Sequence, residues 1–252
     1  MRTSDVSRSE LGLREQNKFE KRQRIRAAAR ELFSKHGYDA ATLRQIAHRA
    51  HVGLGTLFNY AQDKRDLVFL IFNEELSAVT DEALSVPEPR QPLLDQLIAI
   101  SKRHYDYFGK DPALSRILLK ELVFYSEGKQ AATFQGIRGR LLSGIEGFVR
   151  TAQQHRRILS TEDPAIITRH IFFVFSAAIR WWIAKPSPNP VAGLADLRRL
   201  LKLQINGLRP AAGIATNSLK SAASMRQGAE RARHKRGSAI KRGSGIRRQA
   251  DK

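Results

Sequence analysis

The sequence predicts an all-α fold of about nine helices, in which a small N-terminal helix-turn-helix domain precedes a larger helical domain. Three observations favour this fold class. Apolar residues recur at helical spacing along most of the chain, prolines and glycines separate these segments, and no segment has the sustained alternation of a strand. The chain has 252 residues, of which 42% are hydrophobic, so it can bury a substantial core in one or two domains.

The first helix is predicted over residues 18–36. Gly37 follows it, in the position where glycine commonly ends a helix. One apolar stripe at the spacing i, i+3, i+4, i+7 and i+8 comprises Ile25, Ala28, Ala29, Leu32 and Phe33. We expect this stripe to form the core of the N-terminal domain.

The next two helices have helix-turn-helix spacing. Thr42 opens a helix with Gln45 three residues later, which is the pattern of a capping box. A short break at residues 51–53 leads to a further helix that we expect to end near Tyr60. In such a motif the second helix lies in the major groove of DNA, with its N-terminal residues at the base edges.

Two glycines begin this second helix, although glycine is a poor helix former. Gly53 and Gly55 lie two residues apart, directly before and inside the helix. Small residues let the backbone N–H groups of a helix N-terminus approach a phosphate or a base. The sequence therefore predicts that helix propensity is lowered here for the sake of close contact with DNA.

The remaining helices follow from caps and breaks. Asp63 can cap a helix that runs from residue 64 to 84, and the proline-rich segment 85–92 marks a boundary after it. Five longer helices are expected at residues 92–109, 112–126, 130–154, 163–184 and 191–208.

These elements suggest a division of the chain into five parts with different roles. We expect a flexible N-terminal arm, a helix-turn-helix DNA-binding domain, a connecting helix, a ligand-binding and dimerisation domain, and a disordered basic tail. Their ranges are 1–17, 18–62, 63–84, 85–210 and 211–252.

The formal net charge of +20 indicates a polyanionic partner, either nucleic acid or an anionic membrane surface. Residues 211–252 hold eleven Lys and Arg against two Asp and Glu, and they contain the tandem repeat KRGSAI, KRGSGI. Such a segment is either a solubilising extension or an arm that adds nonspecific phosphate contacts. The chain has no cysteine, so thiolate metal sites and cysteine nucleophiles are excluded.

The segment TLRQIAHRAHVGLGTLFNYAQDKRDL, residues 42–67, resembles the DNA-binding domain of the TetR/AcrR family of transcriptional regulators. The resemblance extends back through IRAAARELFSKHGYDAATLRQIA and covers roughly residues 20–75. It implies a ligand-responsive regulator that binds double-stranded DNA, and we expect a repressor. It also implies a homodimer, which predicts a pseudo-palindromic operator with half-sites about one turn apart or a multiple of it.

The resemblance assigns DNA contacts residue by residue. Thr42 and Lys64 are expected to touch phosphate, and Arg44 to reach a guanine. The other expected contacts lie along or just after the reading helix, and they are Leu54, Gly55, Thr56, Phe58, Asn59 and Tyr60. Two positions depart from the family pattern: Phe58 replaces a common Tyr, and Ala61 replaces a large aromatic residue, which predicts looser packing beneath the helix.

The larger domain is expected to form the dimer and to bind an effector. The last two helices are rich in apolar residues, and the resemblance implies a four-helix interface built from both subunits. Similarity to the family also implies a ligand cavity for an apolar or aromatic small molecule. The candidate lining residues are His104, Phe108, Phe124 and Tyr125.

Other functions find less support in the sequence. No catalytic or phosphate-loop motif is present, no cofactor or metal site is expected, and the carboxylate pairs Glu74-Glu75 and Asp81-Glu82 are interpreted as solvated. A membrane-surface protein would need bulky apolar anchors within the basic tail, and we find neither these nor a run of about eighteen apolar residues. An architectural DNA-binding role, driven by charge, stays an alternative. The N-terminus lacks a secretory signal, so we expect a cytoplasmic protein.

Overall fold

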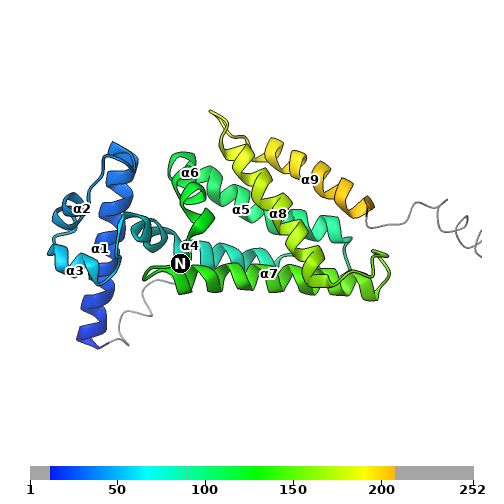
Figure 1. The fold of residues 1–252 in the computed structure, drawn as a ribbon, viewed down its shortest axis with the longest axis horizontal. Helices are drawn as coiled ribbons and strands as arrows, with labels where there is room; N and C mark the ends of the chain where they lie inside the picture. Colours follow the sequence, from blue (N-terminus) through cyan, green and yellow to red (C-terminus); the bar gives the residue numbers. More distant parts are fainter. Residues whose placement is uncertain (1–11, 89, 208–252) are drawn as a thin grey trace, which may run out of the picture. The chain divides into compact units, whose positions relative to one another are not determined.

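The computed structural model describes residues 12–88 and 90–207, and all regular structure within them is helical (Figure 1). This confirms the all-α fold class. The helices are α1 (Leu13–His36), α2 (Leu43–Arg49), α3 (Leu54–Phe58), α4 (Lys64–Ser85), α5 (Leu93–Lys110), α6 (Pro112–Glu121), the short 3-10 helix η1 (Leu122–Phe124), α7 (Ala131–Gln154), α8 (Pro164–Ile183) and α9 (Pro190–Gly207).

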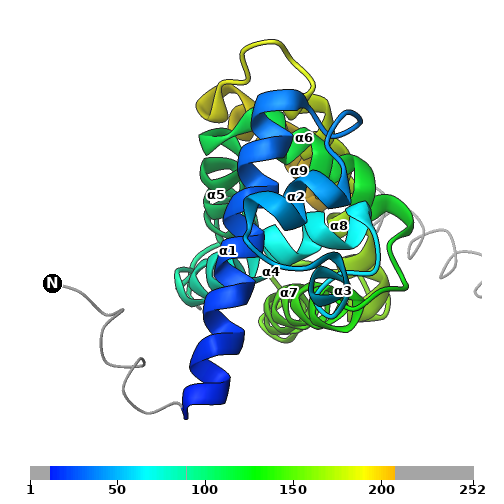
Figure 2. The same cartoon turned by 90° about the vertical axis from the view of Figure 1, so that its left-hand side faces the viewer.

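Helices α1, α2 and α3 form the N-terminal unit, and Figure 2 looks onto it. The predicted stripe of α1 is buried in full, with Ile25 and Ala29 excluded from solvent. Helix α2 packs against α1 and contributes Ile46, while Leu57 anchors α3 in the same core. Ala61 is also fully buried, so the small side chain that replaces a common aromatic residue still lies in the packed interior.

Helix α1 begins at Leu13 rather than at residue 18, so residues 13–17 are helical and do not belong to a flexible arm. The apolar stripe begins only at Ile25, and the turns before it are polar, so hydrophobic periodicity gave no indication of them. Glu15 lies in the first turn, where a negative charge suits the helix dipole. The rest of the expected arm, residues 1–11, and the expected basic tail, residues 211–252, lie outside the described residues.

Helix α4 joins the N-terminal unit to the larger domain. Asp63 caps it, because its carboxylate accepts a hydrogen bond from the main-chain N–H of Asp66 at 2.7 Å. Every residue from Leu67 to Phe72 is buried, since α4 packs against α1 on one side and α5, α6 and α7 on the others. The connecting helix predicted from the sequence is thus a core element of the protein.

Most of the larger domain follows the predicted ranges. One difference is the helix expected over residues 112–126, which ends at Glu121 and tightens into η1 before the chain extends at Tyr125. A 3-10 turn of this kind commonly ends an α-helix. Asp111 caps α6 as expected, accepting from the N–H of Leu114 at 3.1 Å.

One helix among the described residues, α8, is long and apolar enough to cross a membrane by length and composition alone. The sequence search for an uninterrupted apolar run did not identify it, because Arg169 and His170 interrupt the helix. Helix α8 packs against α5, α6 and α7, and it buries Ile167, Ile171 and Ile179 against them. One third of its apolar window is buried by these contacts.

Candidate DNA-reading surface and effector cavity

Helix α2 is held at its start by the predicted capping box. The hydroxyl oxygen of Thr42 accepts a hydrogen bond from the N–H of Gln45 at 3.3 Å, and the side-chain oxygen of Gln45 accepts one from the N–H of Thr42 at 2.9 Å. These bonds satisfy donors that a helix N-terminus leaves free. They also hold the exposed residue Thr42 in place at the start of the helix-turn-helix motif.

The turn between α2 and α3 is tight. His51 adopts a left-handed backbone with φ of 53°, and the N–H of Val52 donates to the carbonyl of Ala47 at 3.0 Å. Gly53 then caps α3, and its carbonyl accepts from the N–H of Leu57 at 3.0 Å. Since Leu57 is fully buried, the opposite face of α3 points outward.

Gly55 lies on that outward face. A Cβ atom added there would meet nothing within 4 Å, and its φ is not positive. A Cβ at Gly53 would meet only the Thr56 hydroxyl, at 4.0 Å. The packing and backbone conformation of the protein therefore do not require glycine at either position, and a partner that approaches the helix from outside would explain both.

The nine predicted DNA contacts lie on a continuous stretch of chain from α2 to the start of α4. Arg44 is exposed, and among the described residues no hydrogen bond or ion pair engages its guanidinium. Arg49, one turn later, is instead paired with Glu31 at 2.8 Å. The exposed residues of the predicted set are Thr42, Arg44, Gly55, Phe58 and Asn59, and the half-buried ones are Leu54, Thr56, Tyr60 and Lys64.

Helix α3 ends at Phe58, so Asn59 and Tyr60 lie in the turn that follows it. The hydroxyl of Tyr60 donates to the main-chain carbonyl of Lys18 at 3.2 Å. This bond brings the polar N-terminal half of α1 beside the end of the reading helix. Lys18 was not predicted, because the sequence around it has no apolar periodicity or motif.

Lys64 also has partners within the protein. Its ammonium donates to the carbonyl of Asp39 at 3.0 Å and lies 4.7 Å from the ring centroid of Tyr38. An ammonium has three donors, so a phosphate contact can be added to these. Lys64 thus also holds the loop between α1 and α2 in place.

A buried carboxylate joins the reading head to the larger domain. Asp66 on α4 is fully buried and accepts main-chain N–H groups from Gln62, Lys129 and Gln130, each at 2.9 Å. The hydroxyl of Tyr125 donates to the same carboxylate. Gln62 follows the reading helix, whereas the other three residues lie between η1 and α7, so Asp66 connects the two domains directly.

Two further features complete this junction. The side-chain amide of Gln130 donates to the main-chain carbonyl of Tyr60 at 2.9 Å. Gly128 has φ of 127°, and a Cβ there would lie 2.8 Å from a carboxylate oxygen of Asp66. Glycine is thus required at residue 128 both by conformation and by space. Sequence reasoning missed the junction because its partners are far apart in the chain.

The acidic residues interpreted as solvated are exposed or half-buried, and each of them also forms an ion pair. Glu74 pairs with Arg26, and Glu75 accepts from Arg30 at 2.6 Å and from the hydroxyl of Tyr107 at 2.9 Å. The second pair also forms ion pairs, Asp81 with Arg140 and Glu82 with Arg103. Adjacent carboxylates point apart on a helix, as expected, but each meets a basic residue of a neighbouring helix.

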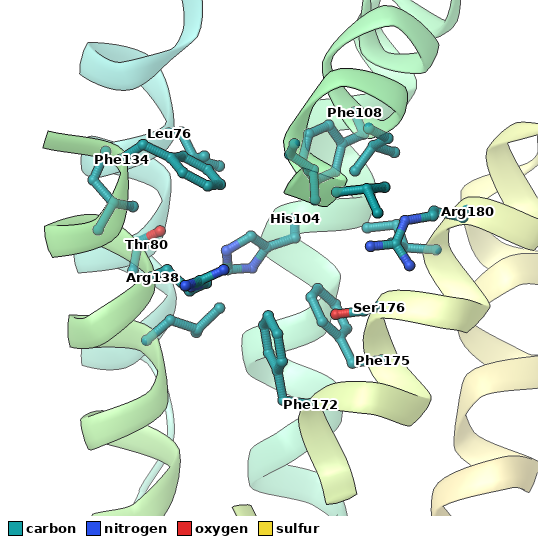
Figure 3. Close-up of a pocket in the computed structure, with 16 residues that line it drawn as sticks. Leu76, Thr80, His104, Phe108, Phe134, Arg138, Phe172, Phe175, Ser176 and Arg180 are labelled. Atoms are coloured by element: carbon teal, nitrogen blue, oxygen red, sulfur yellow. The ribbon is translucent and has the colours of Figure 1, made fainter. Parts of the chain in front are cut away.

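The larger domain contains a cavity of about 150 Å³ that is open on one side and is lined by α4, α5, α6, η1, α7 and α8 (Figure 3). His104 and Phe108 lie in its lining, as the sequence predicted. The aromatic part of the wall also contains Phe134, Phe172 and Phe175, with Thr80, Arg138, Ser176 and Arg180 as polar members.

Two of the four predicted lining residues lie elsewhere. Phe124 is 83% exposed, because the 3-10 turn of η1 directs it away from the core. Tyr125 is buried, but it stacks on Phe69 with ring centroids 3.5 Å apart and donates to Asp66. Both predictions for the cavity are therefore wrong, and Tyr125 belongs to the junction.

The residues of α8 in the cavity were missed for a specific reason. We expected α8 to form the dimer face, although Phe172, Phe175 and Ile179 recur at i, i+3 and i+7. That spacing was the available signal for a second apolar face. The other face of α8 exposes Ile166, Phe173 and Trp181. Trp182 is buried and packs on Tyr105, with the ring centroids 4.6 Å apart.

His104 has an unusual environment inside the cavity. It is 2% exposed, its Nδ1 lies 3.1 Å from the carbonyl of Ile100, and its Nε2 is buried without a hydrogen-bond partner. Burial lowers the pKa of His104 below its ordinary value, which favours the neutral ring. Figure 3 shows the ring pointing toward the middle of the cavity. No group of three His, Asp or Glu side chains in the described part of the chain could hold a metal ion.

Comparison with known proteins gives consistent matches. The family described as bacterial regulatory proteins, tetR family, matches residues 25–71. The HTH-type transcriptional repressor KstR of Mycobacterium tuberculosis is 37% identical over 202 residues, which cover 78% of this chain and 86% of that protein. KstR of Rhodococcus jostii is 28% identical over 213 residues, which cover 83% of this chain and 96% of that protein.

A solved structure extends the likeness to the fold of both domains. Thermus thermophilus FadR, a TetR-family transcriptional repressor in complex with lauroyl-CoA, has a TM-score of 0.55 at 20% identity. The alignment covers 71% of this chain and 92% of FadR. At this identity the likeness supports a shared fold.

The matched segment 25–71 contains the buried stripe of α1, the capping box of α2, the tight turn and the reading helix α3. The match to KstR extends well beyond this segment, into the helices that enclose the cavity. The chain therefore belongs to the tetR family of bacterial regulatory proteins and is a transcriptional repressor of this family rather than an enzyme.

Proposed function

We propose that the protein binds a pseudo-palindromic operator as a homodimer and leaves it when a small apolar effector enters the cavity. The observation that carries the DNA-binding part is Gly55, an exposed helical glycine that the protein itself does not need. Its free space fits the close approach of the N-terminus of α3 to a base edge or a phosphate. Operator binding of this kind places the protein in the bacterial cytoplasm.

Within this surface the predicted contacts have distinct roles. Arg44 reads a base, because its guanidinium is exposed and no other side chain engages it. Thr42 and Lys64 bind DNA phosphates and so position the motif, and Phe58 and Tyr60 pack against the sugar-phosphate backbone of the DNA. Leu54, Thr56 and Asn59 complete the reading surface beside Gly55.

Two subunits are needed because a single reading head buries too little DNA for tight specific binding. The exposed apolar residues of α8 and α9 are the candidates for a self-complementary face between two subunits. On α8 these residues are Ile166, Phe173 and Trp181, which lie on one stripe of the helix. On α9 they are Val191, Leu200 and Leu203. A two-fold axis through this face would present two reading heads to an inverted repeat.

Helix α8 would couple the effector to the dimer, because one of its faces lines the cavity and the other bears the exposed stripe. A ligand between Phe172 and His104 would shift α8, and so the distance between the two reading heads. The lauroyl-CoA in the related FadR supports an effector with an apolar part. The aromatic lining of this cavity supports the same class.

A second route runs through the junction at Asp66. The cavity wall contains Leu122 and Phe134, which flank the segment that carries Tyr125, Lys129 and Gln130. That segment is bonded to Gln62 through Asp66 and to Tyr60 directly. A change in the cavity can thus reach the end of the reading helix through this segment and its hydrogen bonds to Asp66 and Tyr60.

Selection of bound duplexes from random DNA with the purified full-length protein, at two salt concentrations, tests this function. The proposal expects an inverted repeat, and Arg44→Ala should relax the preference at one base position of each half-site, a loss of about 1–3 kcal/mol of discrimination. Arg49→Ala is the matched control, because its guanidinium is paired with Glu31. Selected sequences without any shared motif, with affinity that depends only on salt, would instead indicate the charge-driven architectural role.

A further inference from the structure

The polar atoms of the cavity define what its occupant must offer. Two buried polar side-chain atoms of lining residues, Nε2 of His104 and Nε of Arg180, have no hydrogen-bond partner. A buried polar atom without a partner costs roughly 1–3 kcal/mol, so an occupant that supplies a partner to these atoms would be stabilised. Figure 3 shows both side chains directed at the same space, from α5 and α8.

The tautomer of His104 follows from its neighbour. Nδ1 lies 3.1 Å from the carbonyl of Ile100, and a carbonyl can only accept, so Nδ1 carries the hydrogen and donates it. The ring is neutral, since burial lowers the pKa of His104. Nε2 is therefore a hydrogen-bond acceptor, and it requires a donor from whatever fills the cavity.

The charge around the cavity selects the kind of donor. Arg138 and Arg180 both line it, and no Asp or Glu does. A cationic ammonium donor would be repelled by two guanidinium groups. A hydroxyl is neutral and can donate to Nε2 of His104 while its oxygen accepts from a guanidinium N–H. Ketones, ethers and esters cannot donate.

The volume of the cavity suits a small apolar group. A volume of about 150 Å³ corresponds to an engineered apolar cavity known to hold benzene. The rings of Phe134, Phe172 and Phe175 provide an aromatic wall for such a body. One ring, or an apolar group of that size, fits the space without rearrangement.

We propose that the effector is a hydroxylated apolar molecule of single-ring size, whose hydroxyl donates a hydrogen bond to Nε2 of His104. This inference rests on the proposed role of the cavity as the effector site. It adds a chemical class, which phenols represent most simply.

A pair of probes that differ in one group tests the hydrogen bond. 4-Methylphenol and 1,4-dimethylbenzene have the same shape, and only the phenol can donate. Binding to the full-length protein is measured by titration calorimetry and by the shift in Tm. We expect the phenol to bind about tenfold more tightly than the hydrocarbon, the order of one hydrogen bond.

Substitutions at His104 assign the effect. His104→Phe removes the acceptor and should abolish the preference for the phenol, with hydrocarbon binding kept. His104→Gln retains an acceptor and should restore part of the preference, which covers the case that the Phe variant folds poorly. The control is His155→Phe, since exposed His155 also has its Nδ1 bonded to a carbonyl four residues earlier, at 2.9 Å, but lies outside the cavity.

The outcomes separate this inference from the proposed function. Equal binding of the two probes, or a preference that survives His104→Phe, would overturn the hydroxyl assignment. Binding of lauroyl-CoA alone, with loss of operator affinity, would keep the cavity as the effector site and reject the chemical class. Failure of all three molecules to bind would reject both.

Discussion

The side-chain amide of Gln130 donates a hydrogen bond to the main-chain carbonyl of Tyr60 at 2.9 Å. Gln130 is the N-cap residue of α7, and Tyr60 lies just after the reading helix, so the bond joins these two segments. The residues are seventy positions apart in the sequence. Because Phe134, one turn further along α7, lines the cavity, this bond lies one helical turn from the proposed effector site.

Gln130→Leu should weaken the communication between the cavity and the operator. The variant loses one hydrogen bond, so its free energy of unfolding should fall by about 1 kcal/mol. The decrease in operator affinity caused by an effector, measured by fluorescence anisotropy, should become smaller than in the wild type. Gln96→Leu is the control, because it loses a comparable bond, to the carbonyl of Glu88 at 2.7 Å, outside both the junction and the lining of the cavity. Equal effector responses in all three proteins would remove Gln130 from the route.

Asp66→Asn should destabilise the protein by about 3 kcal/mol, because the buried carboxylate accepts three main-chain N–H groups and one hydroxyl. The NH₂ group of Asn is itself a donor, so it cannot accept the hydrogen bonds that one carboxylate oxygen of Asp66 accepts. Urea denaturation measures the loss, and exposed Glu127 in the same loop offers the control Glu127→Gln. A loss below about 1 kcal/mol would show that the junction contributes little to stability.

His104 should make stability depend on pH in mildly acidic solution. Burial lowers its pKa in the folded protein below the ordinary 6.5, so the unfolded chain takes up the proton first as the pH falls. Below pH 6.5 the free energy of unfolding therefore decreases as pH is lowered, and above it this residue adds no pH dependence. His104→Phe should remove this component, by at most about 1.4 kcal/mol for each pH unit, whereas His155→Phe should retain it. Parallel stability curves for wild type and His104→Phe would contradict the buried neutral ring.

Trp181→Glu should convert the protein into a monomer. Trp181 is 77% exposed on the outer stripe of α8, and a carboxylate there would be buried in the proposed dimer at a high energetic cost. Light scattering after size-exclusion chromatography gives the mass directly. Leu159→Glu, at a similarly exposed apolar residue outside α8 and α9, should leave the mass unchanged. A Trp181→Glu variant that stays dimeric would place the interface elsewhere.

Local signals in the sequence predicted most of the fold. The capping box at Thr42, the cap at Asp63 and the apolar stripe of α1 each involve residues within a few positions of one another, so their geometry follows from sequence spacing. The polar first turns of α1 have no such signal. The sequence of α8 is apolar on nearly every side, so it indicated a dimer face but did not show that a second face lines the cavity.

The candidate sites were predictable to different degrees. The reading surface is continuous in sequence, and so the family resemblance could assign it residue by residue. The cavity is built from five helices, and only His104 and Phe108 of its lining were predicted. Phe124 and Tyr125 were wrongly placed because α6 ends early and η1 rotates the next side chains. The junction at Asp66 depends on contacts between distant segments, which spacing alone does not indicate.

Gly55→Ala tests the central claim most directly, because the proposed DNA contact and the stability of the free protein should respond in opposite directions. Nothing in the protein lies within 4 Å of an added Cβ, so the free energy of unfolding should rise by about 0.4–1 kcal/mol. Operator affinity should fall about tenfold or more, the value of one base contact. Urea denaturation and anisotropy with the same preparation give both numbers. A variant that is more stable and binds the operator as tightly as the wild type would contradict the account, because α3 would then not approach DNA through this glycine.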